Sequence, residues 1–192
     1  MKPRTNPESA FTLIELLIVV TLVGIVSAMA VPLLGQVGDS IKLGQAARDV
    51  ERELQTARMR AVTSNQPMRF RFDCPAAGQY RITELIGTPK VPAAADSAAN
   101  RCGLAVYPFP ADADRNPLTR PNGDGPLRTL DSKVSFSNVI TIEFWPDGSA
   151  HTNTGGVNPW PPIAGTGTTL TLVKGTKTKT IVVNGVGKIQ LQ

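Results

Sequence analysis

One acidic side chain lies inside the most apolar stretch of this 192-residue chain. From Phe11 to Val31 the only ionisable residue is Glu15. A helix over this stretch would be about 30 Å long, enough to cross the hydrocarbon core of a membrane. A carboxylate there costs on the order of a few kcal/mol unless it has a partner, which makes Glu15 a candidate functional residue. The alternative is that Glu15, close to the start of the stretch, lies at headgroup level and has no function.

Two cysteines, Cys74 and Cys102, could form a covalent bond. Lys2 and Arg4 precede the apolar stretch, and the positive-inside rule then places the remainder of the chain outside the cytoplasm. In an oxidising compartment we expect a disulfide, with two free thiols as the alternative. Because the chain has one histidine and no further cysteines, no zinc site and no other cofactor is expected.

A calcium-loop spacing occurs at Asp112, Asp114 and Asn116. The loop would need a glycine where the chain has Pro117 and a glutamate where it has Gly123, so an EF-hand is excluded. An irregular calcium site that includes Asp124 stays open, and a solvated turn is the alternative.

No catalytic motif is evident in the sequence. A nucleophile elbow, a phosphate-binding loop, a dinucleotide fingerprint and a metalloprotease motif are all missing. His151 follows a turn and is expected on a surface strand, without a base and nucleophile pair. The sequence therefore predicts a protein that is not an enzyme.

The helix that carries Glu15 is expected to continue beyond the membrane segment. After Pro32 the pattern becomes amphipathic, and we predict a helix that ends near Ser64, before Pro67. Many of its apolar residues are alanines, which allow a sheet to approach closely. The predicted apolar stripe consists of Leu43, Ala47, Val50, Leu54, Ala57 and Ala61.

The rest of the chain has the pattern of short strands. In residues 68–72 apolar residues alternate with Arg69 and Arg71, which predicts one apolar face and one basic face. Residues 86–130 are predicted to form a long surface loop with a short strand near 104–107, and Asn184-Gly185 predicts a two-residue hairpin turn. Further strands are expected at 79–85, 133–137, 139–145, 168–173, 178–183 and 188–191. The predicted fold class is α+β, with a long helix packed on a small antiparallel β-sandwich.

The start of the chain resembles the class III signal of type IV pilins and type II secretion pseudopilins. The resemblance rests on a short basic leader, the small residue Ala10 and the sequence FTLIELLIV at residues 11–19. It implies that a prepilin peptidase cuts between Ala10 and Phe11 and methylates the new amine. It also implies that Glu15 pairs with the N-terminus of a neighbouring subunit during filament assembly. The residue before the cut is usually glycine, so Ala10 is expected to permit cleavage at a lower rate.

The same resemblance implies a domain organisation. Residues 1–10 would be the leader, 11–34 the membrane and assembly helix, 35–64 its amphipathic continuation, and 65–192 an extracytoplasmic β-rich domain. Gly24 and Pro32 match family positions where the helix can loosen in the filament. The implied location is the bacterial inner membrane, with a single pass. The implied partners are other pilin subunits, the prepilin peptidase and an inner-membrane assembly platform.

The C-terminal half resembles the GspH/FimT group of minor pilins and pseudopilins. The resemblance rests on FWPDGS at residues 144–149 and GKIQL at residues 187–191. Some FimT-like members bind DNA through a Gly-Arg-x-Arg motif, and here one cation is replaced by Lys188 and the other is lost at Gln190. Lys174, Lys177 and Lys179 add charge nearby, and the whole chain has a net charge of +5. These four lysines are candidate DNA contacts, and the alternative is a solvated strand edge.

Overall fold

A computed structural model describes residues 11–111, 121, 123–153 and 156–192, with the backbone alone at 31–34 and 36. The predicted leader with Ala10, and Asp112, Asp114 and Asn116 of the calcium-loop spacing, lie outside the described residues. The chain divides after Asp39 into two compact units, which are described separately.

The first unit consists of the N-terminal part of helix α1 (Leu13–Ser64). Its segment Leu13–Ala30 is long and apolar enough to cross a membrane, and none of this segment is buried within the chain. Gly24 and Pro32 both lie inside the helix, which continues without a break through each position. The predicted long helix and its end at Ser64 are thereby confirmed.

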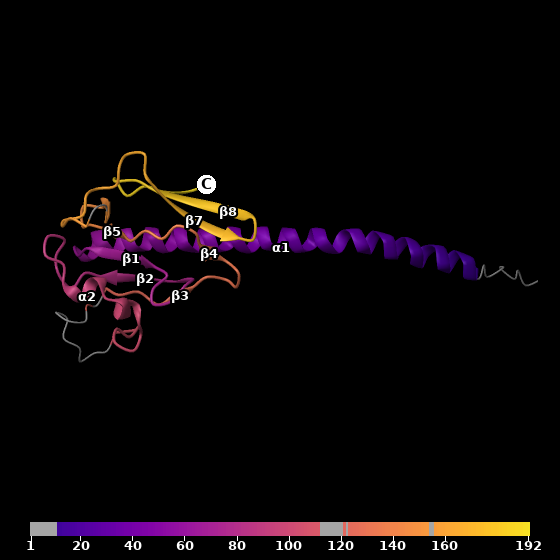
Figure 1. Ribbon diagram of the computed structural model, residues 1–192, viewed down its shortest axis with the longest axis horizontal. Coiled ribbons are helices and arrows are strands. Elements are labelled where there is room, and N and C mark those ends of the chain that lie inside the picture. Colours follow the sequence, from indigo (N-terminus) through magenta and orange to yellow (C-terminus); the bar gives the residue numbers. More distant parts are fainter. Residues whose placement is uncertain (1–10, 112–120, 122, 154–155) are drawn as a thin grey trace, which may run out of the picture. The chain divides into compact units, whose positions relative to one another are not determined.

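The second unit, Ser40–Gln192, contains two antiparallel sheets and the C-terminal part of α1 (Figure 1). The first sheet has the order β3-β2-β1-β5-β6, with β1 (Met68–Phe72), β2 (Gln79–Glu84), β3 (Arg128–Thr129), β5 (Ile142–Phe144) and β6 (Ala150–Thr152). The second has the order β4-β7-β8-β9, with β4 (Ser135–Phe136), β7 (Thr168–Lys174), β8 (Lys177–Val183) and β9 (Ile189–Leu191). Two short helices, α2 (Ala94–Ser97) and η1 (Ala99–Cys102), follow β2.

The core of this unit lies where the alanine-rich stripe of α1 meets both sheets. All six residues of the predicted stripe are at most 2% exposed. They form one apolar cluster with Phe70 and Ile82 of the first sheet and with Leu170 and Ile181 of the second. Since an alanine side chain is a single methyl group, the sheets can approach the helix closely at Ala57 and Ala61. The predicted α+β class is confirmed.

The segment between β2 and β3 differs from the prediction. The strand expected near residues 104–107 is wrong, because these residues form a turn in which Tyr107 N–H donates to Gly103 O at 3.0 Å. The segment was also predicted to be a surface loop, but three of its side chains, those of Asp96, Arg101 and Tyr107, are buried. Strands β3 and β6 were not predicted: β3 lies inside residues 86–130, which were expected to form a loop, and β6 lies between the strands predicted at 139–145 and 168–173.

The hairpin between β8 and β9 has a longer loop than the predicted two-residue turn. Asn184 N–H donates to Lys188 O at 3.1 Å, which leaves three residues between them. Gly187 takes the positive φ of 74° in this loop. Gly185 is needed for another reason, because a Cβ there would lie 2.2 Å from the carbonyl oxygen of Ile163. The two-residue connection occurs instead between β7 and β8, after the pair Lys174 and Lys177.

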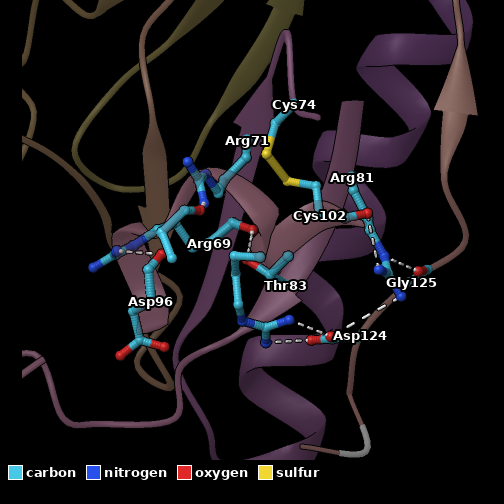
Figure 2. The surroundings of a disulfide bond; sticks show 11 residues. Arg69, Arg71, Cys74, Arg81, Thr83, Asp96, Cys102, Asp124 and Gly125 are labelled. Carbon is cyan, nitrogen blue, oxygen red and sulfur yellow. Dashed lines mark hydrogen bonds and ion pairs between the residues drawn. A yellow bond between two sulfur atoms is a disulfide. The ribbon is translucent and has the colours of Figure 1, made fainter. Parts of the chain in front are cut away.

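The predicted disulfide between Cys74 and Cys102 is confirmed (Figure 2). It joins the residues that follow β1 to the end of η1, and the two Cα atoms are 5.6 Å apart. Both cysteines are buried. The bridge therefore holds the segment after β2 against the first sheet.

Replacing both cysteines by alanine should lower the free energy of unfolding by about 3–4 kcal/mol, because the unfolded chain gains the freedom of a 28-residue loop. Urea unfolding of the full chain in detergent, followed by circular dichroism, measures this change. The oxidised wild-type chain and the same chain with a reducing agent are the controls. An unchanged unfolding midpoint in the double variant would show that the bridge contributes nothing to stability.

Candidate functional site

The start of α1 places Glu15 in the first turn of the helix. Thr12 Oγ1 accepts the backbone N–H of Glu15 at 3.3 Å, and Thr12 O accepts that of Leu16 at 3.2 Å. This is the arrangement of an N-cap threonine followed three residues later by a glutamate. The cap fixes the backbone at Glu15, and the Glu15 side chain is exposed.

Among the residues of this unit that the structure describes, no cation can neutralise Glu15. Residues 11–39 contain no lysine, arginine or histidine, and Lys42 is the first cation along the helix. The side chains around Glu15 are apolar and exposed on every side of the helix; examples are Ile14, Leu16, Leu17, Ile18 and Val19. A helix that is apolar on all sides fits a bilayer or a bundle of similar helices. In either surrounding, a charged Glu15 needs a partner from an amino terminus or from another chain.

The four candidate lysines are not gathered in one patch. Lys174 is buried, with its Nζ donating to Ser132 O at 3.3 Å and lying 3.8 Å from Asp131. Lys177 lies opposite Lys174 at the hairpin end of β8, and Lys179 follows on the same strand. Lys188 lies beyond the other end of β8, about 20 Å away along a strand of this length.

Arg58 of α1 is a polar contact that the sequence did not reveal. Its Nε donates to Gly148 O at 3.0 Å, and its Nη2 donates to Val186 O at 3.1 Å. A Cβ on Gly187 would lie 2.2 Å from Gly148 O and 2.5 Å from Arg58 Nε. The two segments that carry the GspH/FimT resemblance, 144–149 and 187–191, therefore meet at this one helix side chain.

The prediction that His151 is a surface residue is wrong. His151 is buried in β6, its ring is stacked on Trp145 with the centroids 3.6 Å apart, and its Nδ1 lies 2.8 Å from Trp160 O. One of these two partners, Trp160, follows in a loop and gives no periodic signal in the sequence.

Ser149 is a second neighbour of His151 that the sequence did not reveal. Ser149 Oγ lies 2.8 Å from His151 Nε2 and also donates to Asp147 Oδ1 at 2.5 Å. The hydroxyl and the backbone N–H of Ser149 hold the pKa of Asp147 below its usual value. Although a serine and a histidine at this distance can form a nucleophile and base pair, here the serine hydroxyl is bonded to the Asp147 carboxylate and closes the β5–β6 turn.

The basic face of β1 is covered by protein (Figure 2). Arg69 is buried, and its Nη2 lies 3.0 Å from Glu143 of β5. Arg81, opposite Arg71 on β2, is also buried, and its Nε donates to Gly125 O at 2.7 Å. The alternation of apolar and basic faces is confirmed, but the pattern did not reveal that the segment after β2 covers the basic face.

Asp124 holds this covering segment in place. It is buried, it forms an ion pair with Arg101, and its Oδ1 accepts the N–H of Glu84 at 2.9 Å. The Arg101 guanidinium in turn lies 4.2 Å from the ring centre of Tyr107. Asp124 is thus engaged with protein groups. Among the residues that the structure describes, no group of three or more histidine, cysteine, aspartate or glutamate side chains could hold a metal ion.

Two family models match the chain. The prokaryotic N-terminal methylation motif matches residues 5–31, and the type II transport protein GspH matches residues 46–187. Comparisons with curated proteins and with solved structures gave no match. The first match covers Glu15 and the apolar part of α1, and the second covers both sheets apart from β9. The chain belongs to the GspH family of type II transport proteins and has the N-terminal motif and apolar helix of a pilin-like minor pseudopilin.

Proposed function

We propose that this chain is a structural subunit of a type II secretion pseudopilus or a type IV pilus. Before assembly, α1 holds it in the bacterial inner membrane, and residues 65–192 lie on the extracytoplasmic side. Three observations support this proposal: the two family matches, the unburied apolar segment Leu13–Ala30, and a disulfide of the kind that forms outside the cytoplasm. The GspH family is structural, which agrees with a role without catalysis.

The observation that carries the assembly mechanism is that residues 11–39 contain no cation to pair with Glu15. After a prepilin peptidase removes residues 1–10, the methylated amine of Phe11 supplies a positive charge. In the filament, the Phe11 amine of one subunit pairs with Glu15 of its neighbour while their apolar helices bundle. Each charge is tolerated in the bundle only because the other is buried with it. The assembly platform and the other pilin subunits are the partners of this step.

Gly24 and Pro32 have a separate role in this proposal. A Cβ on Gly24 would meet no atom within 4 Å, so packing within the chain does not require a glycine there. Glycine and proline both weaken a helix, the former by its backbone freedom and the latter by the loss of an N–H donor. We therefore assign these two positions to loosening of α1 when it packs among other helices.

Replacing Glu15 by glutamine should leave membrane insertion and cleavage intact and reduce incorporation into filaments at least tenfold, because the charge is lost while the size is kept. Incorporation is measured by co-purification of the tagged chain with sheared filaments. Thr12→Ala is the matched control, because it removes the N-cap and keeps the carboxylate. Normal incorporation of the glutamine variant would contradict the mechanism, and an equal defect in Thr12→Ala would assign the effect to the cap.

DNA uptake, as in FimT-like minor pilins, is the second candidate function. It is favoured by one observation, the exposed Lys188 at a groove of about 550 Å³ that Arg58 also lines. Met59, Val62 and Ile189 make much of this groove apolar, which suits a phosphate backbone poorly.

We expect the full chain in detergent to bind a short DNA duplex weakly, and Lys188→Ala to leave that binding unchanged. Fluorescence anisotropy at several salt concentrations measures both affinities. The exposed Lys90→Ala, far along the chain from β8 and β9, is the control for general charge. Tight binding that falls steeply with salt and is lost in Lys188→Ala would favour DNA uptake over the purely structural role.

A further inference from the structure

A polar cleft of about 380 Å³ lies on the covered face of the first sheet, at the end where β1 and β6 finish and β5 begins. Its lining includes Arg71, Ser97, Val139, Asn153 and Trp160. The apolar residues of β1 point to the opposite face, where they pack in the core with α1. The cleft is thus separate from the helix and from the groove beside Lys188.

Arg71 is the half-buried cation of this cleft. Its Nη1 donates to Ala98 O at 2.7 Å, and in the part of the chain that the structure describes it has no ion pair (Figure 2). Burial lowers the pKa of Arg71, and the positive charges of Arg69 and Arg101 lower it further, while Asp96 acts in the opposite direction. The guanidinium therefore lies in a positive surrounding that an anion would offset.

The neighbouring charges already have partners. Arg69 is paired with Glu143 at 3.0 Å, and Arg101 is paired with Asp124. The carboxylate of Asp96 accepts three backbone N–H groups, from Ile86, Gly87 and Ala93, at 2.7–3.0 Å. Among the described groups at the cleft, Arg71 is the cation without an ion pair, and the negative charge of Asp96 is held by backbone N–H groups.

A single guanidinium selects among anions. One positive charge matches the one negative charge of a carboxylate, whose two oxygens fit the fork of an arginine side chain. A phosphate dianion would keep an unpaired charge in the cleft. Next to Arg71 the lining is apolar at Val139, which is 48% exposed, and at Trp160. This surface suits the methylene groups of a glutamate side chain.

We propose that this cleft binds the carboxylate of an acidic side chain on another protein chain, with Arg71 as the charge partner and with Ser97 and Asn153 as further polar contacts. The site goes beyond the filament role and does not depend on it, because it uses no residue of the N-terminal helix.

The test is a titration of the full chain in nonionic detergent with a capped Ala-Glu-Ala peptide, its Ala-Gln-Ala counterpart, acetate and inorganic phosphate. Nuclear magnetic resonance follows the side-chain Nε–H signal of Arg71, assigned by its loss in Arg71→Lys. We expect the Glu peptide to shift this signal saturably, and to bind about tenfold or more tightly than the Gln peptide. Acetate and phosphate should bind more weakly than the Glu peptide.

Variants at Val139 provide a second test in which Arg71 and its hydrogen bond to Ala98 are left unchanged. Val139→Lys should tighten binding of the Glu peptide severalfold and Val139→Glu should weaken it, since residue 139 lines the cleft and takes no part in the hydrogen bond from Arg71 to Ala98. The exposed Arg48→Gln on α1 is the matched control and should change nothing. Equal binding of the Glu and Gln peptides, tighter binding of phosphate or acetate, or no response to either Val139 variant would overturn the proposal.

Discussion

The folded unit depends on the contact between one alanine-rich stripe of α1 and two β-sheets. Ala47, Ala57 and Ala61 are fully buried in one apolar cluster with residues of both sheets. In its segment Leu13–Ala30 the same helix is apolar, and none of this segment is buried by the residues that the structure describes. Helix α1 therefore has two parts with different sequence patterns. The first part is uniformly apolar, and the part that packs on the sheets is amphipathic.

The elements of this architecture could be predicted where a pattern repeats. The stripe of α1 and the alternation in β1 and β2 extend over enough residues to show their period. The family motifs predicted Glu15 as the residue to examine, and the structure adds the Thr12 cap and the lack of a cation in residues 11–39. Periodicity also shows which side chains share a face of a strand, but not what covers that face.

The unpredicted features depend on contacts between distant segments. Arg58 holds two loops about 90 and 128 residues away in sequence, and His151 Nδ1 lies within hydrogen-bond distance of Trp160 O in a separate loop. The segment after β2 contacts Arg69 through Asp96 O and Arg81 through Gly125 O, and the disulfide ties it to the residues after β1. No local pattern identifies those partners. Because of these contacts, Arg69 of β1 and Arg81 of β2 are buried on one face of the first sheet, while the apolar residues of these strands are buried on the other.

The assembly mechanism requires that the mature chain begins at Phe11, because the positive charge for Glu15 is the amine released there. Mass spectrometry of the N-terminal peptide, taken from the chain extracted from its native membrane, measures this directly. We expect a peptide that begins with N-methylated Phe11. A peptide that still contains Ala10 and the residues before it would contradict the mechanism, since the amine would then lie outside the apolar helix.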